Sequence, residues 1–218
     1  ESQETVPSSG WKIEKVSDRK VRDEWKPLWG KRAVVEDHFN ELVIDLVNPA
    51  GQPERMQLVV RGYNDGFAFC YKIPDGKGPC VNVQSELTAY NFAGDYTAWF
   101  YNGENHNIGP EKLTETDGTR LPVMTVKAGD KHYMAIHEAC LETGAPLVLQ
   151  SKGGESLFSV ASKPTSLSPG YTSAWRVVMY GVTPGVLTDS HLLELLNPDP
   201  DPRYDFSWVK PGLAVWDW

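Results

Sequence analysis

The chain has 218 residues, of which 40% are hydrophobic and 23% are charged. This length and composition are typical of one large globular domain, and they exclude disorder over most of the chain. The 21 basic and 29 acidic residues give a net charge of −8. That balance argues against nucleic acid or an anionic membrane as a partner, because both require a basic patch. No stretch approaches the roughly 18 to 20 apolar residues of a membrane span.

Residues 1–10 form a polar leader that lacks the apolar centre of a signal peptide. From Trp11 onward, short apolar segments alternate with turn residues, which predicts an all-β, antiparallel fold. The expected strands are 11–16, 21–29, 39–47, 56–63, 67–73, 81–92, 96–102, 123–126, 133–138, 146–149, 157–160 and 174–182.

The connections between these strands carry their own signals. The sequence Asn64-Asp65-Gly66 predicts a hairpin turn, and residues 102–118 are expected to form a long surface loop. One short helix is expected near the C-terminus, over residues 189–196. Cys70 and Cys80 flank a loop rich in proline and glycine, where either a disulfide or a reduced pair is compatible with the spacing.

The last 21 residues differ in character from the rest. Alternating prolines after Asn197 predict an extended connector. The final stretch then carries three of the eight tryptophans, Trp208, Trp216 and Trp218. Because chain ends are usually polar, this aromatic end predicts that the polypeptide continues into a second domain. The alternative is a last strand that docks back on the same β-sandwich.

Glu138 is a charged residue on the apolar face of an expected strand, and its position there needs an explanation. In the expected strand 133–138, alternation places Met134, Ile136, Glu138 and also Cys140 on one face, and His137 on the other. A carboxylate on an apolar face needs an arginine, a metal or a route to water, because burying an unpaired charge is costly. The opposite orientation of His137 argues against an acid/base dyad formed by these two neighbours.

Other chemistry is sparse. The sequence has no Walker A loop, no dinucleotide fingerprint and no His-Glu-x-x-His helix. The aromatic residues Tyr96, Trp99, Phe100 and Tyr101 are too closely spaced all to lie in a core. We therefore expect some of them at an exposed or interface position, where such rings can also stack on sugars.

Several stretches together resemble the N-terminal domain of glycoside hydrolase family 97, the bacterial α-glucosidases and α-galactosidases. The resemblance covers nearly the whole chain and is carried by 39–42 (FNEL), 61–69 (RGYNDGFAF), 133–141 with its Glu-Ala-x-Leu, 174–178 (AWRVV), 196–198 (LNP), 208–212 (WVKPG) and 216–218 (WDW). The chain departs from the family pattern at Ala174, where proline is frequent, and at Thr143-Gly144, where an aspartate-tyrosine turn is usual.

The resemblance implies a galactose-mutarotase-like β-supersandwich over residues 11–197. Residues 198–218 would then form the connector and the start of a catalytic (β/α)8 barrel. It also implies an exo-acting, periplasmic or secreted bacterial enzyme that acts on oligo- or polysaccharides. The glutamate of the Glu-Ala-x-Leu motif, here Glu138, would bind calcium together with ligands from the barrel. This chain alone would then contain no catalytic residue.

Two other classes of function stay open at this point. A stand-alone carbohydrate-binding, lectin-like module would need an exposed aromatic groove of its own. A mutarotase-like enzyme would need a glutamate and a histidine that face one cleft. The residues do not decide between α-glucosides and α-galactosides, or between inversion and retention, because the geometry of the barrel sets that outcome.

Overall fold

The computed structural model of the chain describes residues 9–27, 30–51, 53–76, 80–101, 103, 107–199 and 201–216. Most of the predicted polar leader, up to Ser8, lies outside the described residues, as do Asp217 and Trp218. Within the described part, no helix is long and apolar enough to cross a membrane.

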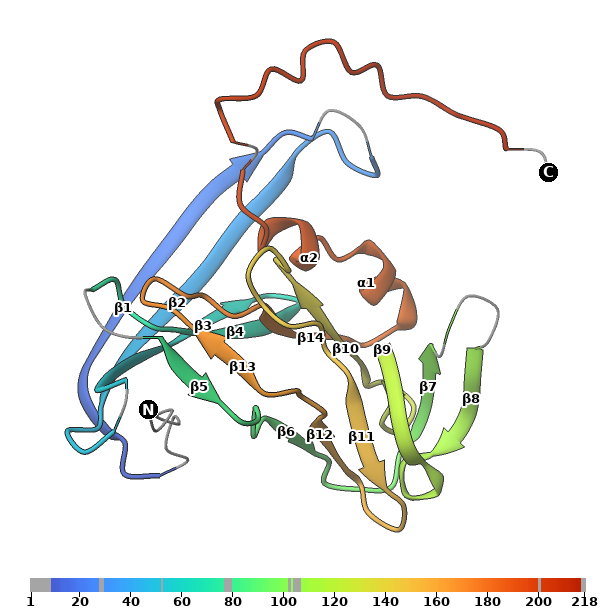
Figure 1. The fold of residues 1–218 in the computed structure, drawn as a ribbon. Coiled ribbons are helices and arrows are strands. Elements are labelled where there is room, and N and C mark those ends of the chain that lie inside the picture. The colour runs from blue at the N-terminus through green and yellow to red at the C-terminus, as the bar shows by residue number, and fades with distance from the viewer. Residues whose placement is uncertain are drawn as a thin grey trace.

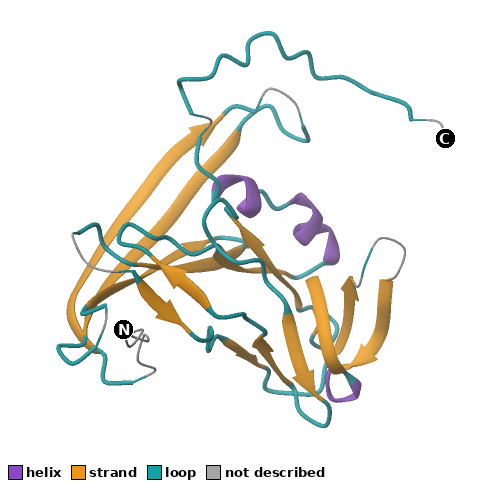
Figure 2. Ribbon diagram, viewed as in Figure 1, coloured by secondary structure: helices purple, strands orange, loops and turns teal. Residues whose placement is uncertain are grey.

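The fold consists of antiparallel strands arranged in two layers (Figures 1 and 2). The larger layer contains, in spatial order, β1 (Lys12–Trp25), β2 (Val35–Val47), β3 (Arg55–Tyr63), β4 (Gly66–Lys72), β14 (Trp175–Gly181), β10 (Tyr133–Ala139), β9 (Asp117–Lys127), β7 (Thr97–Tyr101) and β8 (Asn107–Lys112). The smaller layer contains β11 (Leu149–Lys152), β12 (Leu157–Val160) and β6 (Ala89–Asn91), beside a separate pair formed by β5 (Val81–Val83) and β13 (Thr165–Leu167). The predicted all-β, antiparallel supersandwich is therefore confirmed.

Strand β9 belongs to both layers. Its second half, from Met124 to Lys127, pairs with β10, and its first half, from Asp117 to Arg120, pairs with β11. A core closes the space between the layers and includes Ile136 of β10, Phe100 of β7 and Phe158 of β12. Because β9 forms backbone hydrogen bonds in both layers, the two layers are joined by a continuous strand as well as by the packing of their side chains.

The outer face of the larger layer has a second core under two short helices. Helix α1 (Pro184–Asp189) and helix α2 (Leu192–Leu195) lie against β10 and β14, where Leu192 and Leu196 pack on Ala135, Ala139 and Val177 (Figure 1). The short helical segment expected near the C-terminus is thus present. It is divided at Ser190 and His191, and it begins five residues earlier than the sequence indicated, at Pro184.

Several strand predictions needed correction. The predicted segments 11–16 and 21–29 are joined in one strand, β1, which ends at Trp25, is almost wholly exposed and pairs with β2 as a projecting ribbon (Figure 2). Leu28 and Trp29 of the second segment lie outside the described residues. The segment 81–92 divides into β5 and β6, and the predicted strand 146–149 is displaced to β11. The predicted surface loop 102–118 is wrong in part, because β8, a 3-10 turn (Leu113–Glu115) and the start of β9 lie within it.

The C-terminal segment runs outside the two layers as an extended trace (Figure 1). Trp208 is 74% exposed and Trp216 is 82% exposed, so neither of these two described tryptophans is buried against the sandwich. The thiols of Cys70 and Cys80 are free, and Cys70 is buried, which raises its pKa to about 11.

A prediction concerns Gly66, which closes the β3–β4 hairpin with φ +155 at the turn expected from the sequence. A Cβ atom there would lie 2.3 Å from the backbone oxygen of Val178. We expect Gly66→Ala to lower the free energy of unfolding by about 2 kcal/mol or more, from backbone strain and overpacking together. Gly62→Ala, in open space on the neighbouring strand, is the matched control. Equal urea midpoints for the two variants would contradict this account of the turn.

Candidate functional site

Glu138 lies near the end of β10 and faces the space between the two layers. It stands directly opposite Arg176 of β14 in the strand register, and its side chain is only 10% exposed. The predicted sharing of one face by Ile136 and Glu138 is confirmed. The prediction for Cys140 is wrong, because β10 ends at Ala139 and Cys140, with φ 56, turns to pack against the other core.

The carboxylate of Glu138 is held through one of its two oxygens. The backbone N–H of Leu147 donates a hydrogen bond to Oε2, and Nη1 of Arg176 lies 3.8 Å from the same atom. Oε1 accepts no hydrogen bond from any described residue. Burial raises the pKa of Glu138, although the Leu147 N–H and the charge of Arg176 oppose that effect.

Arg176 has its principal partner elsewhere. Its Nε and Nη2 donate to Oε1 and Oε2 of Glu86 at 2.9 and 2.6 Å, and Nη1 donates to the carbonyl of Ala145 at 3.3 Å. The side chain of Arg176 is only 2% exposed, and this forked pairing satisfies most of its donors. Glu86 therefore neutralises Arg176, and the charge of Glu138 remains as the net charge of this cluster, defined here as Glu86, Glu138 and Arg176.

The loop that supplies Ala145 and Leu147 passes very close to β14. A Cβ atom on Gly144 would lie 2.0 Å from the backbone nitrogen of Ala174, so a residue with a side chain would not fit without a shift of the loop. The two departures from the family pattern noted above, Gly144 and Ala174, are thus in direct contact. This close approach brings the backbone groups of the loop to the cluster.

His137 points away from Glu138, as the alternation predicts. The backbone N–H of Glu138 donates to Nδ1 of His137 at 2.8 Å, so the proton of the neutral ring lies on Nε2. Burial lowers the pKa of His137. Its ring lines a cavity of about 340 Å³ on the outer face of the larger layer, together with Trp99, Tyr101, Thr125 and others. Glu138 and His137 do not share a cleft, and this argues against a mutarotase-like acid/base pair.

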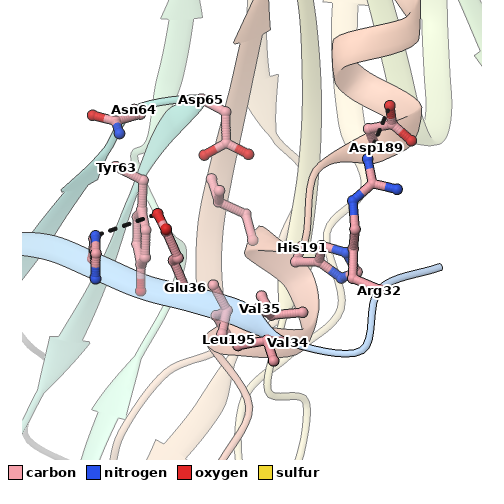
Figure 3. Close-up of a pocket in the computed structure, with 12 residues that line it drawn as sticks. Arg32, Val34, Val35, Glu36, Tyr63, Asn64, Asp65, Asp189, His191 and Leu195 are labelled. Carbon is pink, nitrogen blue, oxygen red and sulfur yellow. Dashed lines mark ion pairs between the residues drawn. The ribbon is translucent and has the colours of Figure 1, made fainter. Parts of the chain in front are cut away.

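Another cavity, of about 240 Å³, lies between α2 and the β3–β4 turn (Figure 3). Two pairs of lining side chains lie close together: Arg32 forms an ion pair with Asp189 at 3.6 Å, and His38 lies 3.5 Å from Glu36. Asp65 lies in the β3–β4 turn, as predicted, and its side chain points toward the cavity (Figure 3).

The carboxylate of Glu138 could supply one oxygen ligand to a metal ion. The described residues contain no group of three or more His, Cys, Asp or Glu side chains placed to hold a metal ion. Calcium takes six to eight oxygen ligands, and the free Oε1 of Glu138 is one suitable oxygen. A calcium ion bound here would therefore need further oxygen ligands beyond the carboxylate of Glu138.

These features define a two-layer β-sandwich domain with a buried arginine–carboxylate cluster and no assembled catalytic centre among the described residues. The chain belongs to the family described as Glycosyl-hydrolase 97 N-terminal, whose profile matches residues 3–198. The family resemblance seen in the sequence is thereby confirmed.

Relatives and solved structures agree with this assignment. The chain is 26% identical to a retaining alpha-galactosidase of Bacteroides thetaiotaomicron and to a probable retaining alpha-galactosidase of Streptomyces bingchenggensis, with 93% and 97% of the chain aligned. A glycoside hydrolase family 97 enzyme from Pseudoalteromonas sp. strain K8, solved with acarbose, matches 94% of the chain with a TM-score of 0.82 and 26% identity. A beta-arabinopyranosidase shares the fold alone, with a TM-score of 0.67 and 18% identity. The chain spans about a third of the length of each of these proteins.

A prediction follows from the unequal roles of the two carboxylates. We expect Glu86→Gln to lower the free energy of unfolding by about 3 kcal/mol, because it leaves the buried Arg176 with a weaker partner. Glu138→Gln keeps an oxygen for the Leu147 N–H and should leave the stability unchanged or raise it. Chemical denaturation of the two variants checks this, and a larger loss in Glu138→Gln would contradict the assignment of Glu86 as principal partner.

The pH dependence gives an independent test. A carboxyl whose pKa is raised in the folded state binds its proton more tightly there, so its contribution to stability falls as pH rises above the ordinary value of 4.5. We expect Glu138→Gln and the unaltered chain to differ little at the lowest pH at which both are folded. The variant should gain relative stability as pH rises through the titration of Glu138. A difference that is constant with pH would contradict the raised pKa.

Proposed function

We propose that this chain is the N-terminal β-sandwich domain of a periplasmic or secreted, exo-acting glycoside hydrolase. Its partner is a catalytic (β/α)8 barrel in the same polypeptide, and the substrate is an α-galactoside or an α-glucoside. Family membership and the names of the relatives support this proposal, because the chain corresponds to one third of enzymes called alpha-galactosidases.

Glu138 is the residue through which this domain would reach the active site. The observation that carries this part of the proposal is the free Oε1 beside an arginine whose charge Glu86 has already neutralised. An arginine with no other partner would hold Glu138 as its counter-ion and would repel a cation. With Glu86 in place, Glu138 can give one oxygen to calcium, and Arg176 and the Leu147 N–H orient the carboxylate.

The chemistry divides between the two domains. Calcium, when bound, positions substrate and stabilises developing negative charge. The residues of this chain hold and orient one carboxylate, and the proton transfers of glycoside cleavage require further carboxyl groups that the barrel would supply.

We expect the 218-residue chain alone to hydrolyse neither nitrophenyl α-galactoside nor nitrophenyl α-glucoside. The complete enzyme should cleave at least one of them. The assay compares release of nitrophenol by both proteins at equal molar concentration. Turnover by the short chain that scales with its concentration would contradict the division of labour proposed here.

In the complete enzyme, Glu138→Gln should weaken calcium binding by about tenfold or more, because one charged ligand is removed. Isothermal titration of the metal-free enzyme with calcium measures this directly, and excess calcium should restore part of the activity. Glu142→Gln is the control, since Glu142 is an exposed carboxylate in the loop that follows β10. Equal calcium affinity in both variants would show that Glu138 is a structural partner of Arg176 only.

A further inference from the structure

We infer that the cavity formed by β7, β9 and β10 on the outer face of the larger layer binds a neutral sugar ring. We call it the Trp99 cleft, and among the described residues it is lined by Trp99, Phe100, Tyr101, Asn107, Pro122, Val123, Thr125 and His137. This inference does not depend on the proposed calcium ligand, because Glu138 faces the opposite side of β10.

The aromatic residues of β7 divide between two environments. Phe100 is 2% exposed and packs between the layers, with Tyr96 beside that core, whereas Tyr101 is 38% exposed. Trp99 is half-buried and shares the outer face with Thr125, its partner in the strand register. The dense aromatic run in the sequence therefore serves a core on one side and the cleft on the other.

The backbone around Trp99 is irregular on both sides of β7. Opposite Ala98 to Phe100, strand β8 contributes one extra residue, since the partners are Glu111 and Ile108. Opposite Trp99 to Tyr101, strand β9 contributes two extra residues, since the partners are Thr125 and Leu121. Such bulges redirect side chains and often lie beside binding sites.

Gly109 allows the bulge in β8 to approach Trp99. It has φ +117, and a Cβ atom there would lie 2.6 Å from the carbonyl of Ala98 and 3.1 Å from Cδ1 of Trp99. The backbone of Gly109 thus packs closely against one edge of the half-buried indole. A fixed aromatic plane lowers the entropic cost of stacking a ligand on it.

The polar groups of the cleft suit a neutral ligand. None of the described lining residues carries a permanent charge. Nε2–H of His137 is a donor, and Thr125 and Asn107 offer both donors and acceptors. The cavity at α2 differs, because an arginine and three acidic residues line it.

An aromatic plane bordered by neutral donors and acceptors matches the chemistry of a pyranose. The C–H face of the ring packs on the indole, and the equatorial hydroxyls reach the amide, hydroxyl and imidazole groups. The volume of about 340 Å³ lies at the lower end of the range for small-molecule sites, roughly 300 to 1,000 Å³. One sugar unit of a longer glycan would fill such a site.

The test is calorimetric titration of the 218-residue chain with maltotriose and with raffinose, which carry α-glucosyl and α-galactosyl units. We expect at least one sugar to bind, and Trp99→Ala to weaken its binding by about tenfold or more. Trp25→Ala is the matched control, because Trp25 is 37% exposed on β1, at the edge of the larger layer away from β7. It should leave the affinity unchanged.

A second variant guards against a folding defect in Trp99→Ala. Asn107 is exposed, so Asn107→Ala should keep the melting temperature and still weaken sugar binding. Absence of binding by the unaltered chain up to about 10 mM sugar would overturn the inference, as would equal affinity in the Trp25 and Trp99 variants. Neither result would bear on catalysis by the complete enzyme, which is measured separately.

Discussion

The buried positive charge of Arg176, between the two β layers, is the main constraint on the structure of this domain. The guanidinium of Arg176 cannot be left unpaired there, because an isolated buried charge costs several kcal/mol. The structure meets this demand with a forked pair to Glu86, a carbonyl from the loop after β10, and the more distant Glu138. Three separate parts of the chain are thereby tied to one side chain of β14.

This arrangement separates two duties that one carboxylate would otherwise share. Glu86 neutralises Arg176. Arg176 also orients Glu138, but it does not need Glu138 as its counter-ion. The second oxygen of Glu138 is therefore available near the end of a central strand, where the backbone of Glu138 pairs with Arg176 of β14. Sites on strands are held more precisely than sites on loops.

The sequence predicted those features that depend on short-range pattern. Alternation in β10 correctly placed Glu138 and His137 on opposite faces, and β12 has the predicted bounds, 157–160. The polar run Ser17-Asp18-Arg19-Lys20 concealed the continuity of β1, because an exposed ribbon lacks the alternation of a half-buried strand. Glu86 was missed because it lies 90 residues from Arg176, in a stretch between β5 and β6 whose path depends on tertiary packing. Gly109 and the bulges around Trp99 were missed for the same reason.

The long exposed ribbon also bears on how the domain behaves in concentrated solution. Among the described strands, β1 pairs with β2 alone, so its outer edge presents unpaired backbone groups over 14 residues. Such an edge is a template for strand addition by another molecule. Here it carries both signs of charge, with Lys15, Asp18, Arg19, Lys20, Arg22 and Asp23 in close succession. A second copy approaching in register would have to desolvate these charges, so the ribbon can project from the domain without promoting aggregation.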